Sequence, residues 1–434
     1  NLLLFFFILY YYYIIMSFYS DANVSTKYID PSIYTQNART TFQLDAMEAA
    51  YLPNLRLLFM GVTAGSQQDY NRLVGALALI KNIRLLDGKT VLCSMNEAQF
   101  YQGFNNVNRS NGANESVHSY QACNGLGFSV LGENNTIART VQKLDANTTA
   151  STTSSATLDL RSILPMLNSV SHLPTAVFRN LNLQIEYDAT PDSQILVDTS
   201  VLFDTLRPVL CADVIDNPTV VDNLNSKLTN ATWTEWEHDL FIVPAAPNDG
   251  GPNDQEVVQP VNVQLNGFNN KRLERLLICK EIGTAAKELS GNEVQGVGGK
   301  YSSQACFRQK VQFRVNGRNI LPRQGIVGDN ERLAHVVDTF GECTAFIGSN
   351  TYGAGGTITD YLEIGRERLG QLDYIGIYLG EYINNLQIRF ERTGLEDNTL
   401  KRPTTDLLRA HCYGEVRKAL IIGGPTGYRI VYAQ

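Results

Sequence analysis

The sequence predicts a mainly β protein made of two tandem eight-stranded jelly rolls, with short helices in the loops and in the linker between the halves. Two observations lead to this prediction. A strand-like motif recurs about 200 residues further along the chain, and many short alternating runs are separated by long polar loops. Short strands with long connections are typical of sandwiches and barrels, of which the jelly roll is a main form.

Length and composition agree with two β domains. A chain of 434 residues is too long for one ordinary domain and suits two of roughly 200 residues each. Its hydrophobic content of 44% is enough for packed cores. The net charge is −7, and this acidic balance argues against nucleic-acid binding as the main role, because gripping phosphates needs clustered Lys and Arg.

The chain opens with two segments that we place outside the folded halves. Residues 1–15 are almost entirely apolar and aromatic and precede the first methionine, Met16. They lack the basic segment and the small-residue cleavage site of a signal peptide, and they are short for a membrane span of about 20 residues. We interpret them as a translated AT-rich stretch upstream of the true start. Residues 16–46 are polar and without a clear period, which predicts an N-terminal arm that a partner subunit orders.

The first jelly roll is expected over residues 47–215. Its clearest strand is Leu181–Tyr187, where apolar and polar residues alternate. Asp87-Gly88 ends an apolar run and predicts a hairpin turn. The other expected elements are a strand from Tyr51, a helical pattern over 70–81, a helix over 158–173 interrupted near Pro165, and an apolar strand over 201–214.

A helical linker at 216–231 and a second jelly roll at 232–434 complete the predicted order. The linker pattern is short and is capped by Asp and Asn. In the second half, Asn316-Gly317 predicts a tight hairpin turn within residues 310–321. The other expected elements are strands at 260–265, 273–280, 385–390 and 428–432, and a helix at 331–346.

An internal repeat supports the two-half organisation. Asn182–Tyr187 and Asn385–Phe390 share the pattern Asn-Leu-Gln-Ile-charged-aromatic at an offset of 203 residues. A weaker pair matches Ile83-Arg-Leu before Asp87-Gly88 with Phe313-Arg-Val before Asn316-Gly317, where the turns are 229 residues apart. Alternating strands draw on few residue types, so either pair alone could arise by chance. Two pairs in the same order favour duplication.

Several of these segments together resemble the major capsid proteins of polinton-like viruses and of related virophages. The resemblance runs from about residue 45 to the C-terminus and depends on the order of the pieces rather than on one specific motif. Those pieces are residues 51–58, 70–76, 83–88, 160–187, 268–278 and 311–322.

The resemblance implies a double-jelly-roll subunit that forms homotrimeric, pseudo-hexagonal capsomers in an icosahedral shell around double-stranded DNA. It also implies a virion location, assembly inside the host cell, and penton and minor capsid proteins as partners. The chain is short for this group, which implies small outer loops. We expect assembly contacts at the N-terminal arm and at the loops 102–114, 245–254 and 290–303.

No catalytic, cofactor-binding or metal-binding residues are expected, and we predict that the chain is not an enzyme. Ile421–Gly427 is Gly-rich but lacks the Gly-Lys-Ser/Thr of a phosphate-binding loop, so it predicts a turn before the last strand. Tyr352–Thr357 likewise lacks the setting of a dinucleotide site. Glu237, His238 and Asp239 are adjacent and would point in different directions in a strand, so Trp233–Asp239 predicts a strand over buried tryptophans.

The seven cysteines show no CxxC spacing, and the five histidines are scattered. Both facts disfavour a zinc site, and the cysteine pattern is typical of a reducing compartment. Two other functions remain open from the sequence alone. One is a minor or vertex capsid protein, which usually has a single jelly roll. The other is a carbohydrate-binding or hydrolysing jelly roll, because paired carboxylates cannot be recognised from spacing.

Overall fold

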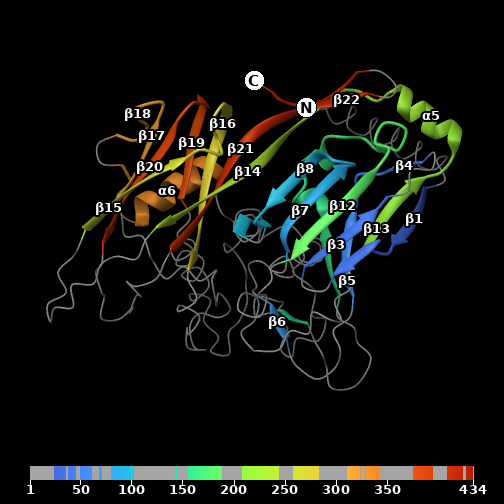
Figure 1. The fold of residues 1–434 in the computed structure, drawn as a ribbon, viewed down its shortest axis with the longest axis horizontal. Helices are drawn as coiled ribbons and strands as arrows, with labels where there is room; N and C mark the ends of the chain where they lie inside the picture. Colours follow the sequence, from blue (N-terminus) through green and yellow to red (C-terminus); the bar gives the residue numbers. More distant parts are fainter. Residues whose placement is uncertain are drawn as a thin grey trace, which may run out of the picture.

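A computed structural model describes sixteen stretches of the chain, and Figure 1 shows them as two β-rich halves side by side. Two long strands run through the middle, between the halves. The described residues are 24–35, 38–44, 49–60, 68–70, 80–98, 100–101, 142–144, 155–187, 208–243, 258–282, 310–322, 325–326, 329–341, 375–393, 408–423 and 427–433.

The first half contains two antiparallel sheets, named here after their central strands. The β13 sheet comprises β1 (Val24–Ile29), β4 (Ala50–Tyr51), β5 (Arg56–Met60), β10 (Ser155–Asp159), β11 (Leu173–Pro174) and β13 (Pro208–Ile215). The β12 sheet comprises β2 (Ile33–Thr35), β3 (Arg39–Gln43), β7 (Ile80–Asp87), β8 (Thr90–Asn96) and β12 (Leu181–Tyr187). A separate pair is formed by β6 (Gln68–Tyr70) and β9 (Gln142–Leu144).

The second half also contains two antiparallel sheets. The β21 sheet comprises β14 (Ala231–Val243), β16 (Lys271–Ile282), β19 (Ile375–Ile383), β21 (Leu408–Ile422) and β22 (Tyr428–Tyr432). The β20 sheet comprises β15 (Val258–Leu265), β17 (Val311–Val315), β18 (Arg318–Asn319) and β20 (Leu386–Thr393). The two long strands in the middle of Figure 1 are β14 and β21, which pair along the whole of β14.

The two halves share one strand order. The order β1-β13-β5-β10 in the first half corresponds to β14-β21-β16-β19 in the second. The order β3-β12-β7-β8 corresponds to β15-β20-β17-β18. The repeat found in the sequence therefore lies at equivalent places, since β12 and β20 are both central and each pairs with the strand of the second repeat pair.

The hairpin turns of the two halves are built in the same way. Asp87 Oδ1 accepts a hydrogen bond from the Asn180 backbone N–H at 2.8 Å, and Asn316 Oδ1 accepts one from the Asn384 N–H at 2.8 Å. In both halves the turn side chain thus holds the residues that lead into the central strand. Asn316 and Gly317 both have positive φ, as the predicted Asn-Gly turn requires.

Each half buries apolar side chains between its sheets, but the larger core crosses between the halves. The burial of β12 alternates strictly, with Leu183 and Ile185 fully buried. Phe313 and Ile388 occupy the matching core of the second half. The first-half core also takes in side chains from the second half, namely Ala231, Trp233, Trp236, Leu277, Cys279, Val336, Tyr413 and Leu420.

Two α-helices lie where helical patterns were predicted. α5 (Pro218–Ser226) falls within the predicted linker, and the side chain of Asn217 caps it by accepting from Thr219 N at 3.1 Å. α6 (Asp329–Phe340) confirms the predicted helix at 331–346 as far as Phe340. None of the described helices is long and apolar enough to cross a membrane.

Some expectations need correction. Residues 24–43 do not form a free arm, since they supply β1, β2 and β3 to the sheets of their own chain. The helix predicted over 158–173 is replaced by the end of β10 and two 3-10 helices, η2 (Leu160–Ser162) and η3 (Pro165–Asn168), because Pro165 cannot continue a helix that starts before it.

The helix predicted over residues 70–81 is also wrong at both ends. Tyr70 closes β6, and residues 80–81 open β7. The strand predicted over 201–214 is found as β13, from Pro208. The parts of these two predictions at 71–79 and 201–207 lie outside the described residues.

Candidate functional site: the seam between the halves

The most elaborate arrangement of side chains lies where the two halves meet. We call this contact the seam and define it as residues 80–98 and 100–101 of the first half together with β14, β21 and β22 of the second. The sequence places alternating large side chains on β14, and the 13-residue strand is long enough to reach past its own sandwich. One face of β14 covers the core of the second half with Phe241, while Trp233 on the same face joins the core of the first half.

The outer face of the β21 sheet is covered by aromatic and charged groups. The ring of Trp236 lies 5.3 Å from that of Tyr101 and 5.9 Å from that of Phe340 on α6. The Arg275 guanidinium lies 5.7 Å from the centre of the Trp236 ring and makes a bidentate ion pair with Glu415, at 2.5 and 2.6 Å. Planar paired donors of this kind fix the geometry as well as the charge.

A second group of charges lies on the inner face of β14. Glu235 Oε1 accepts from Lys418 Nζ at 3.0 Å and from the Ser94 backbone N–H at 3.3 Å, and Glu235 Oε2 accepts from Trp233 Nε1 at 2.9 Å. Because Ser94 belongs to β8, this buried carboxylate joins the two halves directly. Lys418 also pairs with Glu237 at 3.2 Å.

The same charges shift the ionisation of their neighbours. Burial raises the pKa of Glu237, but hydrogen bonds from Lys271 and Tyr432 and the charge of Lys418 outweigh it and hold that pKa below its ordinary value. Burial lowers the pKa of Lys418, yet the carboxylates of Glu235 and Glu237 outweigh it and raise that pKa. Burial and its bond to Glu237 raise the pKa of Tyr432 to about 12. The first two shifts favour the charged forms of Glu237 and Lys418, and the third keeps Tyr432 protonated as a donor to Glu237.

The last strand, β22, binds to residues of the first half. Tyr428 of β22 donates its hydroxyl to Asp87 Oδ2 at 2.8 Å, and its ring packs edge-on against Phe178 at 4.9 Å. The predicted turn before this strand is confirmed, since Gly423 N donates to Gly427 O at 2.8 Å.

Two histidines complete the seam. His238 Nε2 and His411 Nδ1 are 3.0 Å apart, and the His411 ring stacks on Phe100 with centroids 3.9 Å apart. Tyr413 donates its hydroxyl to the backbone oxygen of Glu97 at 2.6 Å.

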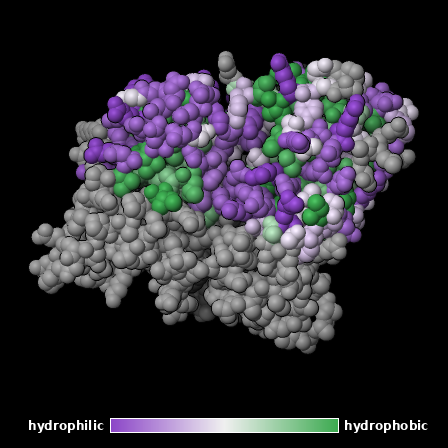
Figure 2. All heavy atoms as spheres, in the orientation of Figure 1, coloured by the Kyte–Doolittle hydropathy of each residue, from purple (hydrophilic) through white to green (hydrophobic). Residues whose placement is uncertain are grey.

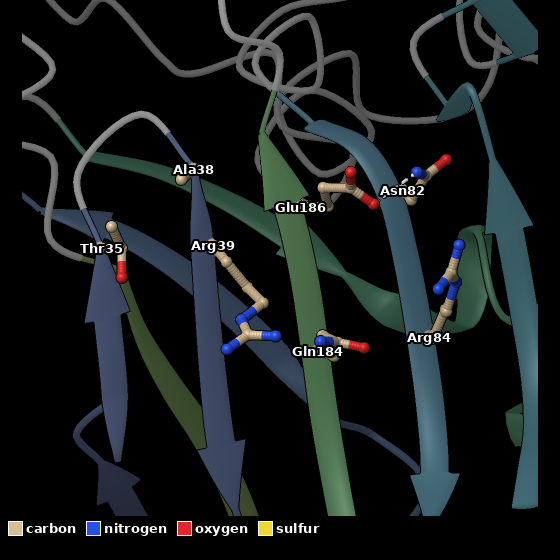
Figure 3. Close-up of a pocket in the computed structure, with 7 residues that line it drawn as sticks. All are labelled: Thr35, Ala38, Arg39, Asn82, Arg84, Gln184 and Glu186. Atoms are coloured by element: carbon tan, nitrogen blue, oxygen red, sulfur yellow. Dashed lines mark hydrogen bonds between the residues drawn. The ribbon is translucent and has the colours of Figure 1, made fainter. Parts of the chain in front are cut away.

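A shallow depression lies elsewhere, on the outer face of the β12 sheet (Figure 3). Its volume is about 490 Å³, and it is lined by Thr35, Ala38, Arg39, Asn82, Arg84, Gln184 and Glu186. Asn82 Nδ2 donates to Glu186 Oε2 at 2.7 Å (Figure 3), so the carboxylate is already engaged. The described lining contains no cysteine or histidine.

The surface around these features is mostly hydrophilic. Figure 2 shows hydrophilic residues over most of the second half on the face in view, with an apolar area along its lower margin. Large exposed apolar or aromatic side chains include Tyr28 and Tyr378, which are 69% and 62% exposed.

Some of the site residues singled out in the sequence lie in the described part of the chain, and others do not. Trp233 and Trp236 are buried as predicted, but they lie on opposite faces of β14 rather than together beneath it. Within the described residues, no group of three or more His, Cys, Asp or Glu side chains is arranged to hold a metal ion. The expected contact loops at 102–114, 245–254 and 290–303, and the Gly-rich residues 352–357, lie outside the described residues. Sequence reasoning missed the seam, although the unusual density of Trp, Glu and His in 233–239 marked one of its strands.

Comparison with known proteins identifies the fold. No family model matches the sequence, and no curated protein sequence matches it. Among solved structures, the chain is similar to the PBCV-1 virus capsid quasi-atomic model, with a TM-score of 0.56, 10% identity, and coverage of 95% of this chain and 98% of that one. It is similar to PBCV-1 Vp54 fitted into a reconstruction of the virophage Sputnik, with a TM-score of 0.53, 10% identity and the same coverage. The mavirus major capsid protein matches at a TM-score of 0.49 and 9% identity, over 94% of this chain and 90% of that one.

At 10% identity these matches show the fold alone. The chain is mainly β and has the fold of double-jelly-roll major capsid proteins.

Proposed function

We propose that this chain is a structural, non-catalytic major capsid protein that trimerises into pseudo-hexameric capsomers and tiles an icosahedral viral shell. The single observation that carries the proposal is the equal strand order of the two halves, side by side on one chain. This order also supports two tandem eight-stranded jelly rolls, of which the first begins with β1 rather than at residue 47, with a linker at 216–231 and the second at 232–434. Three copies would place six similar jelly rolls around a three-fold axis.

The seam indicates which surface the trimer would use. Inside the chain, the outer face of β14 is covered by residues of the first half. The strand equivalent to β14 is β1, because each lies alone along one edge of its central strand. On the outer face of β1, Tyr28 is 69% exposed and Val24 is 37% exposed. If neighbouring copies in the trimer repeat the contact of the seam, the outer face of β1 contacts the second half of the next copy.

This proposal also supplies the location and partners. Such a protein resides in the virion, assembles inside the host cell, and contacts penton and minor capsid proteins. The two open alternatives have less support. A minor or vertex protein is expected to have one jelly roll, and no described feature favours a carbohydrate site over a protein contact.

The test is the assembly state of the purified chain. We expect native mass spectrometry to give a homotrimer of the 48.2 kDa subunit, and negative-stain electron microscopy to show six-sided particles or tiles. Tyr28→Asp should shift the trimer to monomer, because it places a charge in the proposed contact without disturbing a core. Tyr378→Asp is the matched control, since it alters a similarly exposed tyrosine on the β21 sheet and should leave the trimer intact. A wild-type chain that stays monomeric at all concentrations would contradict the proposal.

A further inference from the structure

The histidine pair at the seam has no part in the proposed assembly contacts. His238 lies on the outer face of β14 and His411 on the same face of β21, with their facing ring nitrogens 3.0 Å apart and ring centroids 5.2 Å apart. At this separation one nitrogen must donate a proton and the other must accept, so the contact requires at least one neutral ring.

Among the described residues, the groups around His238 do little to stabilise a positive charge on its ring. From β21, the Tyr413 ring lies 5.1 Å from that of His238, and its hydroxyl donates to Glu97 O. From the first half, the Phe100 ring covers His411. Lys81 of β7 is the described cation that acts on His238, and it pairs with Glu97 at 3.7 Å. Cys279 of β16 is the residue paired with His411 across the sheet.

Ionisation follows from this arrangement. Burial lowers the pKa of His238 to about 3, and the nearby His411 and the charge of Lys81 add to the effect. His238 is therefore neutral while the seam is closed, even in mild acid.

We propose that the seam is an acid-sensitive joint, in which protonation of His238, at its contact with His411, opens the contact between the two halves. A charged His238 ring is disfavoured by its partial burial and by the like charge of Lys81 in the first half. The first-half residues Phe100 and Glu97 are held against the same strands. Opening moves Lys81 away from His238 and lets water surround its ring. This behaviour belongs to the single chain and holds whether or not it assembles.

The direction and size of the effect follow from linkage. In the open state His238 regains an ordinary value near 6.5, whereas in the closed state it stays deprotonated down to about 3. Acid therefore favours the open state. The equilibrium constant for opening should rise up to about tenfold for each pH unit below 6.5. Glu237, whose pKa is lowered in the closed state, adds its own effect only below its ordinary value of 4.5, so the window from 6.5 to 4.5 isolates the histidines.

The chain contains its own reporter of the seam. Its two tryptophans, Trp233 and Trp236, both lie on β14 and are buried there. We would follow their emission in urea titrations of the full-length chain at pH 7.5, 6.5, 5.5 and 4.5, with far-ultraviolet circular dichroism recorded in parallel. The expected result is a red shift whose urea midpoint falls steadily as the pH is lowered, ahead of the loss of strand signal.

Two variants separate the pair from other titrating groups. His238→Gln and His411→Asn keep a hydrogen-bonding nitrogen or oxygen near the contact but cannot be protonated in this range. In each variant, the change in the opening constant between pH 6.5 and 4.5 should be at least tenfold smaller than in the wild-type chain. His335→Gln on α6 is a control at a partly buried histidine outside the pair and should behave as wild type. His172→Gln tests a buried histidine outside the seam as defined and should leave the tryptophan midpoint unchanged.

A second measurement covers the case in which a variant does not fold. Hydrogen–deuterium exchange at the ring carbon of each histidine, read by mass spectrometry, gives the titration of His238 in the wild-type chain. Titration far below 6 supports the proposal, and titration near 6.5 overturns it. A wild-type midpoint that does not move between pH 7.5 and 4.5, or variants that keep the full dependence, would overturn it as well.

Discussion

Glu235 shows how a single residue holds the two halves together. Its side chain is almost completely buried, yet it accepts from four donors, which are Lys418 Nζ, Trp233 Nε1 and the backbone N–H and hydroxyl of Ser94. A buried charge of this kind is costly to remove from water, so it adds little net stability over an apolar substitute. Once the charges are in place, however, removing Glu235 leaves the Trp233 N–H and the Ser94 N–H without this acceptor and leaves Lys418 with Glu237 alone. The residue therefore specifies the position of β8 relative to β14.

We expect Glu235→Ala to lower the free energy of unfolding by about 3 kcal/mol, because it leaves Lys418 and the Trp233 N–H without their main acceptor. Glu235→Gln keeps an oxygen in place and should cost roughly 1–2 kcal/mol. Urea unfolding at pH 7.5 measures both. Glu381→Gln is the matched control, because its partner Arg318 is 70% exposed, and its cost should stay below about 1 kcal/mol. Equal losses of unfolding free energy in the Glu235 and Glu381 variants would contradict the claim that burial of Glu235 sets the size of the effect.

At the scale of elements, α6 lies directly on the β21 sheet because one strand residue lacks a side chain. A Cβ added at Gly376 of β19 would lie 2.6 Å from Phe340 Cε2 and 3.2 Å from Val336 Cα, both on α6. The helix thus approaches the strand more closely than any larger residue would permit. Because Phe340 also packs near Trp236, the height of the helix above the sheet affects the seam.

Gly376→Ala should therefore lift α6 and cost roughly 1–3 kcal/mol, as overpacking of a core does. Phe340→Leu in the same chain should recover part of the loss, but not all, because the contact with the Val336 backbone remains. Thermal unfolding compares the single and double variants. The control is Gly423→Ala, where the nearest atom to the added Cβ is 3.7 Å away and almost no change is expected. Failure of Phe340→Leu to recover any stability would contradict this account.

The elements that the sequence predicted are those governed by local chemistry. Alternation identified β12 and β20, and the Asp87-Gly88 and Asn316-Gly317 pairs identified both hairpins. β1 was missed because it is an edge strand whose residues are mostly exposed on both faces, so Val24–Ile29 carries no period. The seam was missed for a different reason. His238 and His411 are 173 positions apart, and no local pattern reports such a contact.

At the scale of the whole molecule, the halves share a core and are not independent domains joined by a tether. Trp236 and Tyr413 are counted in the first-half core, and Tyr428 binds Asp87 across the seam. Separating the halves would expose these apolar surfaces and break the paired charges of Glu235. The seam is therefore a contact that requires both halves.

We expect the two halves to remain bound after the linker is cut. A protease site inserted at the exposed residues 226–227, at the end of α5, would divide the chain without touching β14. At pH 7.5 the two fragments should elute together in size-exclusion chromatography, because the seam keeps its aromatic and ionic contacts. Trp236→Ala removes the ring between Tyr101 and Phe340, and a loss of roughly 3–5 kcal/mol should let the fragments separate. Lys27→Ala, on an exposed pair with Asp216 away from the seam, should leave them together. Separation of the wild-type fragments at neutral pH would mean that α5, rather than the seam, holds the halves side by side.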